Sequence, residues 1–298
     1  MAKYKLSISI LSILIAIASL LVALFGLLTK DGPGEHAVPS FRGEDEIILY
    51  GKGLYQHEPL SGAVQVLAQD VVTIIIGIPL LLLSIYLYRR QSVKGHLLLT
   101  GTLAYFLYTY SSYSFLLMYN NFFLVYVALM SASFFAFILS IMCFDINNLS
   151  SYFARKLPTK LIGGFLITVG ILILLMWVGR IIPSLMNGTI PYGLEIYTTL
   201  VIQALDLGFV VPLAILAGIL VIKQNSIGYL LAPIMIMKGF TLGTAVTVMA
   251  ITMILSGVQT SYSEVIIFSI INLLFVFFMF LILSNVNELP DEPQKLEL

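Results

Sequence analysis

One carboxylate interrupts a long apolar run in the second half of the chain. Residues 197–216 read YTTLVIQALDLGFVVPLAIL, and Asp206 is the charged residue among them. A charged side chain at the centre of a bilayer costs about 2.5–3.5 kcal/mol on insertion scales. Such residues face other helices or water, and they mark candidate sites for ligand binding or ion coupling.

The next two apolar runs are also interrupted by polar residues, Lys238 and Asn272. At 1.5 Å per helical residue, Asp206 lies roughly 13 Å, Lys238 roughly 16 Å and Asn272 roughly 10 Å from one end of its run. Consecutive helices are usually neighbours, so we expect Asp206 and Lys238 to be coupled, with Asn272 serving either ion. Gln203 shares the helix face of Asp206. The pair is either a structural ion pair or a functional site, and the sequence leaves both readings open.

A second candidate region is rich in tyrosine. Tyr105 and Tyr108 lie deeper than the aromatic belt expected at a membrane surface, and their hydroxyls need partners when buried. Arg180 is expected near the outer end of its own run. These residues predict a tyrosine-lined vestibule that opens to the outside, capped by residues 50–58. The alternative to a vestibule is that these tyrosines belong to the aromatic belt at the membrane surface or to ordinary helix packing.

Composition indicates which elements position these residues. The chain is 59% hydrophobic and 10% charged, whereas soluble domains carry about 25% charged residues. This predicts an integral membrane protein whose partner is the lipid bilayer. About 20 apolar residues span a bilayer as a helix, and every spanning backbone group must be hydrogen-bonded internally. The fold class is therefore an all-α polytopic helical bundle, one transmembrane domain over residues 1–298, with about eight spans: 6–28, 70–88, 97–118, 122–143, 161–182, 197–222, 227–255 and 265–286.

Basic residues predict the orientation of these spans. Ten of the 15 Lys and Arg residues fall on the side of the N-terminus and four on the opposite side, with Lys238 inside a span. Cytoplasmic loops carry the excess of positive charge, so both termini are expected in the cytoplasm. Residues 29–69 then form an extracytoplasmic loop that caps the bundle, and residues 287–298 a short disordered tail. We expect the plasma membrane, which in a prokaryote is the cytoplasmic membrane.

Several function classes lack their motifs in this sequence. We find no phosphate-binding loop, no zinc-protease helix and no serine-nucleophile motif. The three histidines are far apart and Cys143 is the single cysteine, so we expect no metal, no cofactor and no catalytic residues. The formal net charge is zero, which argues against a nucleic-acid partner. An enzyme acting on lipid would depend on Asp70, His57 and Glu58. No internal repeat is evident by eye.

Prolines within the second, sixth and seventh spans, Pro79, Pro212 and Pro233, bear on function because proline interrupts a helix. Interrupted helices near a buried charge are typical of secondary transporters. The sequence thus favours a small-solute or ion transporter with a site formed by Asp206, Lys238 and Asn272. The alternative is a non-enzymatic membrane receptor, sensor or accessory subunit, which would bind a ligand or a membrane-protein partner at the vestibule.

Overall fold

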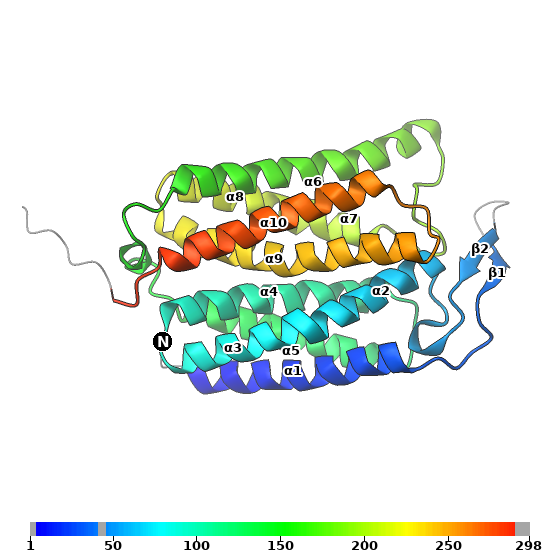
Figure 1. The fold of residues 1–298 in the computed structure, drawn as a ribbon, viewed down its shortest axis with the longest axis horizontal. Helices are drawn as coiled ribbons and strands as arrows, with labels where there is room; N and C mark the ends of the chain where they lie inside the picture. The colour runs from blue at the N-terminus through cyan, green and yellow to red at the C-terminus, as the bar shows by residue number, and fades with distance from the viewer. Residues whose placement is uncertain (1–3, 41–45, 290–298) are drawn as a thin grey trace, which may run out of the picture.

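The computed structural model describes residues 4–40 and 46–289, which form a mostly helical bundle with one two-stranded sheet. The long helices run between two ends of the bundle (Figure 1). We call the end at which the first helix begins the terminal end, and the end that carries the β-strands the hairpin end. The expected C-terminal tail lies largely in residues 290–298, outside the described residues.

The first half of the chain folds into four long helical segments, and the second of these is interrupted. A π-helix, a wider turn with i→i+5 hydrogen bonds, separates α2 from α3. The segments are α1 (Lys5–Leu28), α2 (Leu60–Val72) with η2 (Thr73–Gly77) and α3 (Ile78–Arg89), α4 (Val93–Leu116), and α5 (Phe123–Met142).

The second half repeats this pattern, again with a π-helix in its second segment. A short 3-10 helix, η3 (Leu149–Tyr152), connects the two halves. The segments are α6 (Thr159–Asn187), α7 (Val201–Leu205) with η4 (Asp206–Val210) and α8 (Val211–Ile222), α9 (Ser226–Leu255), and α10 (Tyr262–Ser284).

Seven of these segments are long and apolar enough to cross a membrane, within the described residues. For the remaining expected span, 97–118, the structure has α4, which is 24 residues long but less apolar because it carries many threonine, serine and tyrosine residues. The second expected span, 70–88, begins earlier, at Leu60. The connecting segment is therefore residues 29–59 rather than 29–69.

The segment between α1 and α2 lies at the hairpin end. Strands β1 (His36–Pro39) and β2 (Glu46–Leu49) pair antiparallel, with His36 opposite Leu49. The short helix η1 (Gly53–Tyr55) follows, and it buries Leu54 and Tyr55 in the core of the first half. Leu54 and Tyr55, in the segment between α1 and α2, are thus packed onto the bundle.

The two halves pack side by side (Figure 1). Helices α1 to α5 surround one apolar core, and α6 to α10 surround most of a second one. Helix α4 contributes to both cores, and it packs against α9, which in turn packs against α2. The interface between the halves is therefore formed mainly by α2, α4 and α9.

The structure reveals an internal repeat that the sequence analysis missed. The π-helices η2 and η4 begin at residues 73 and 206, and helices α4 and α9 begin at residues 93 and 226, so both pairs differ by 133 residues. The intervening helices α3 and α8 begin and end with the same offset. Each half crosses the bundle four times, so both start at the same end, and the repeat is parallel rather than inverted.

Local details follow the same offset. Gln91 and Gln224 both have a positive φ, 65° and 54°, which turns the chain between the paired helices. Ser92 and Asn225 then cap the next helix with their side chains. Gly95 and Gly228 sit where a Cβ atom would lie within 3 Å of the backbone of the preceding helix. The turn geometry is therefore the same in both halves.

Gly101 of α4 marks the position where the two halves meet. A Cβ atom there would lie 2.3 Å from Cβ of Met237 and 3.3 Å from the carbonyl oxygen of Ile234. Ile234 is the residue equivalent to Gly101 under the 133-residue offset. Equivalent residues that contact each other lie on a two-fold axis, so a pseudo-two-fold axis passes between α4 and α9 at this point.

Candidate functional site

Asp206 is held by three separate helical segments. It is the first residue of η4 and is 9% exposed. Its Oδ1 atom accepts a hydrogen bond from the Tyr108 hydroxyl of α4 at 2.7 Å. Its Oδ2 atom accepts one from Nε1 of Trp177 in α6 at 2.8 Å. Both carboxylate oxygens are thus bound by neutral donors.

Lys238 lies in α9 and is 8% exposed. Its Nζ atom lies 4.1 Å from the centre of the Tyr108 ring, which is a cation–π contact. In residues 4–40 and 46–289, the ion pairs within 4 Å are Lys52–Glu35 and Arg180–Glu264. Asp206 and Lys238 therefore do not form a direct ion pair, and Tyr108 contacts both of them.

The helix geometry accounts for this separation. Helices α8 and α9 are joined by a short turn at residues 223–225. From that turn, 1.5 Å per residue places Asp206 roughly 24 Å and Lys238 roughly 18 Å along the bundle. Depths counted from the ends of the expected spans do not show this stagger of roughly 6 Å.

The other polar residues expected at this site lie around it or elsewhere. Gln203, in α7, is half-buried on the hairpin side of Asp206. Asn272 of α10 donates to the Thr244 hydroxyl at 3.1 Å, so it joins α9 to α10 and serves neither charge. Trp177 was not anticipated, although it is the single tryptophan and lies within an apolar run.

The repeat gives this site a neutral counterpart in the first half. Thr73 and Tyr105 occupy the positions equivalent to Asp206 and Lys238. The Tyr105 hydroxyl lies 2.8 Å from Thr73 Oγ1 and accepts a hydrogen bond from Gln69 at 2.8 Å. All three side chains are at most 3% exposed. Tyr105 and Tyr108 therefore point into different halves of the protein.

Of the two tyrosines expected to line an open vestibule, Tyr105 is packed in the core of the first half, together with other tyrosines of α4 and α5. Tyr105, Tyr110, Tyr113 and Tyr126 are at most 4% exposed. The Tyr113 hydroxyl donates to Asp70 Oδ1 at 2.9 Å, and the Tyr55 hydroxyl donates to Asp70 Oδ2 at 2.6 Å. These contacts form a closed hydrogen-bonded cluster and not the wall of an opening.

A second group of carboxylates connects the two halves at the hairpin end. Glu58, 1% exposed, accepts hydrogen bonds from the backbone N–H of Met118 at 2.6 Å and from the Tyr197 hydroxyl at 2.7 Å. Ser61 Oγ lies 2.8 Å from both carboxylate oxygens of Glu195, which share its single O–H donor. Burial raises the pKa of Glu58 to about 7, although the two hydrogen bonds oppose the shift. Burial also raises the pKa of Glu195.

Arg180 is part of a cavity at the hairpin end. Its Nη2 atom lies 2.9 Å from Glu264 Oε1, and its guanidinium lies 5.5 Å from the centre of the Trp177 ring. The cavity has a volume of about 510 Å³. Its lining comes from the ends of α6, α9 and α10 and from the intervening loops: Arg180, Tyr192, Met253, Gln259, Thr260, Ser261 and Glu264.

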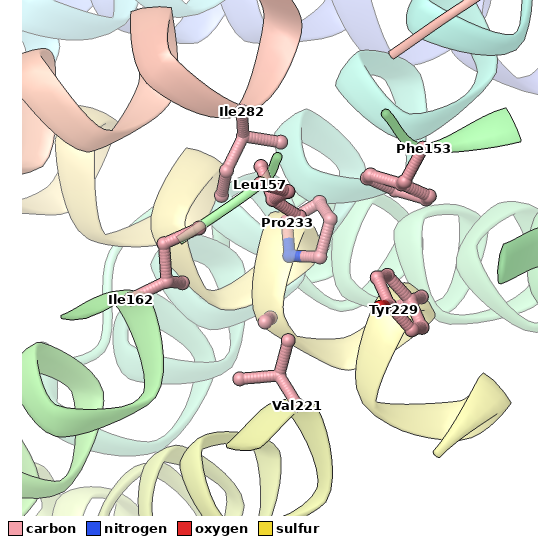
Figure 2. Close-up of a pocket in the computed structure, with 8 residues that line it drawn as sticks. Phe153, Leu157, Ile162, Val221, Tyr229, Pro233 and Ile282 are labelled. Carbon is pink, nitrogen blue, oxygen red and sulfur yellow. The ribbon is translucent and has the colours of Figure 1, made fainter. Parts of the chain in front are cut away.

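A smaller pocket lies in the second half and is entirely apolar in its lining surface (Figure 2). Its side chains come from the α5–α6 connection and from α6, α8, α9 and α10, and they include Pro233, which lies inside α9. It has no room for a water molecule. None of the charged site residues line it.

Comparison with known proteins adds no family to this picture. No protein-family model, curated protein or solved structure matches the chain. In the described parts of the chain, no group of three or more His, Cys, Asp or Glu side chains could hold a metal ion. Asp206, Tyr108, Trp177 and Lys238 are therefore the candidate site on geometry alone.

Proposed function

We propose that this protein is a transporter for a small solute or ion, with Asp206 and Lys238 in its binding site. One observation carries the proposal: the same interrupted helix occurs at equivalent positions of two parallel repeats. In each copy a π-helix is followed by a proline, Pro79 in one and Pro212 in the other. Interrupted helices at corresponding positions of two halves are the best pointer to a transport site.

The charged residues of the site strengthen this interpretation. Asp206 is the first residue of the second π-helix, and π-helices are frequent at functional sites. A pair kept only for stability would be expected in direct contact, because a buried charge is costly unless it is closely paired. Here the two charges are separate, and each is held by Tyr108.

The halves also have the contacts that alternating access requires. Glu58–Tyr197 and Ser61–Glu195 join the first half to the second at the hairpin end. Relative rocking of two repeats about a central site would break such contacts on one side and expose the site there. We infer that the structure corresponds to the state in which the hairpin end is closed.

Accessibility of Gln203, next to Asp206, tests this function without a known substrate. In a Cys143→Ser background, Gln203→Cys is exposed to a membrane-impermeant maleimide in intact cells and in inverted vesicles. We expect reaction in both preparations, more slowly than at exposed positions, because the site opens to each side in turn. The controls are Tyr119→Cys at the hairpin end and Asn147→Cys at the terminal end, both exposed. Each should react in one preparation only.

The alternative, a membrane receptor, sensor or accessory subunit, is favoured by the cavity around Arg180 at the hairpin end. Such a protein binds its ligand or partner on one side. Reaction of Gln203→Cys in one preparation, or in neither, would contradict alternating access and favour this alternative.

A further inference from the structure

The repeat permits a direct comparison of two equivalent side chains, Tyr105 in the first half and Lys238 in the second. Tyr105 has a complete set of partners: its hydroxyl is bound by Gln69 and Thr73, and it is fully buried. The polar atom of the first-half site is therefore satisfied within the protein. No external group is needed to explain the arrangement.

Lys238 differs in this respect. An ammonium group has three N–H donors and no acceptor. Over residues 4–40 and 46–289, the structure gives Lys238 no hydrogen-bond acceptor from a side chain or backbone carbonyl and no carboxylate within 4 Å; its partner is the face of the Tyr108 ring. The residue is nonetheless 92% buried by its 8% exposure. Buried charges are normally paired and hydrogen-bonded.

Asp206 does not fill this role. Its carboxylate binds Tyr108 and Trp177, and no carboxylate oxygen of the described residues, Asp206 included, lies within 4 Å of Lys238 Nζ. It supplies a negative charge at a distance that partly balances the ammonium. The three N–H donors of Lys238 remain for a group that the protein does not supply.

The residues around Lys238 are also less buried than those around Tyr105. Tyr108, Trp177 and Gln203 are each half-buried, whereas Gln69, Thr73 and Thr109 in the first half are fully buried. The guanidinium of Arg180 stacks near Trp177 and lines the cavity at the hairpin end. Arg180 thus contacts one residue of the site and also lines the cavity.

We propose that Lys238 binds a small monovalent anion, and that this anion is the solute of the proposed transport site. A carboxylate or an inorganic ion such as nitrate has oxygen atoms that can accept hydrogen bonds from the ammonium N–H groups. A divalent anion fits less well, because Asp206 already places a negative charge in the same low-dielectric region. This inference rests on the proposed transport function for its meaning, but anion binding can be measured separately.

The single tryptophan provides the measurement. Trp177 donates to Asp206, so its fluorescence reports on the site directly. The purified full chain is titrated with sodium acetate and, separately, with sodium nitrate, at an ionic strength held constant with sodium sulfate. Thermal unfolding is followed in parallel. We expect a saturable change in fluorescence and a higher unfolding temperature with acetate, with nitrate or with both. Acetamide, which has the same shape as acetate without its charge, should have no effect.

Variants assign the effect to Lys238. Lys238→Met should raise the anion concentration at half-saturation at least tenfold (roughly), because the substitution removes the cationic partner of the buried anion. Lys223→Met, at an exposed lysine in the α8–α9 turn, should leave binding unchanged. If Lys238→Met does not fold, Lys238→Gln keeps a donor without the charge and should show the same loss.

The outcomes separate the two proposals. A response to acetate rather than nitrate identifies an organic anion, and the reverse an inorganic one. No saturable response to either, or an equal response in Lys238→Met, overturns the anion assignment. If Gln203→Cys is labelled from both sides in that case, transport stands and only the ligand class is wrong. Anion binding with labelling from one side alone means that the site binds the anion but does not transport it.

Discussion

At the scale of single residues, Glu58 shows how a carboxylate can join parts of the chain that are distant in sequence. It precedes α2, yet it binds the α4–α5 loop through Met118 and the α6–α7 loop through Tyr197. Glu195 also lies near enough to raise its pKa, and Tyr126 of α5 faces the same region. The contact between the halves at this end therefore depends on a group that titrates near neutral pH.

We expect the stability of the protein to fall as pH rises toward neutrality. The pKa of Glu58 is raised from 4.5 to about 7. The folded state therefore binds this proton more tightly than the unfolded state. The corresponding stabilisation is complete below pH 4.5 and is lost as pH rises to about 7, and it amounts to about 3 kcal/mol. Thermal unfolding in detergent at pH 5 and pH 8 measures it.

Glu58→Gln, which resembles the protonated form, should remove most of this pH dependence and leave the smaller part that comes from Glu195. The control is Glu46→Gln, at an exposed position in β2. If wild type and Glu58→Gln lose stability in parallel between pH 5 and pH 8, Glu58 is not the titrating group.

At the scale of helices, the close approach of α4 and α9 depends on Gly101. A larger side chain would push against Met237 and the backbone at Ile234. We expect Gly101→Leu to destabilise the protein by about 1–3 kcal/mol, the usual cost of overpacking. Thermal unfolding measures the loss, and the Asp206–Trp177 contact should report it as a change in Trp177 fluorescence.

Gly164→Ala serves as the matched control because no neighbouring atom lies within 4 Å of a Cβ atom at that position in α6. It should be neutral or stabilise by up to about 1 kcal/mol through helix propensity. Equal effects of the two substitutions would mean that α4 and α9 are not tightly packed at this point.

The helices were predictable to different degrees. Long apolar runs predicted about eight spans, and seven of them correspond to helices of the described residues that are long and apolar enough to cross a membrane. The start of α2 was missed because Gln65 and Gln69 lower its hydropathy, although other helices bury this stretch. The π-helices were not predicted, because composition does not indicate them. Asp206 and Thr73, at which they begin, make contacts with other helices that the sequence does not show. Proline positions gave the only hint.

The site was predictable in part for similar reasons. Burial of Asp206 and Lys238 follows from their place in apolar runs, but their partners Tyr108 and Trp177 come from α4 and α6, and their choice depends on helix rotation. The repeat did leave a trace in the sequence: Pro79 and Pro212 each precede a Gln by 12 residues and a Gly by 16 residues. These shared residues are too few for the repeat to be recognised by inspecting the sequence.

At the scale of the whole molecule, the distribution of basic residues predicts that the hairpin end faces outward. Tyr119 is 77% exposed at that end, so Tyr119→Cys in a Cys143→Ser background should react with an impermeant maleimide in intact cells. Asn147→Cys, at the terminal end, should react only in inverted vesicles. The reverse pattern would place both termini outside the cytoplasm.

The two halves also differ in how much they need the covalent connection between them. Each half surrounds most of one apolar core, α4 contributes to both cores, and residues 143–158 between α5 and α6 join the halves at the terminal end. The contacts between α4 and α9 hold the halves together independently of that link. Two separate polypeptides, cut within this connection and produced in one cell, should therefore reassemble into the complete bundle. Chain continuity would then supply a high effective concentration rather than the fold itself.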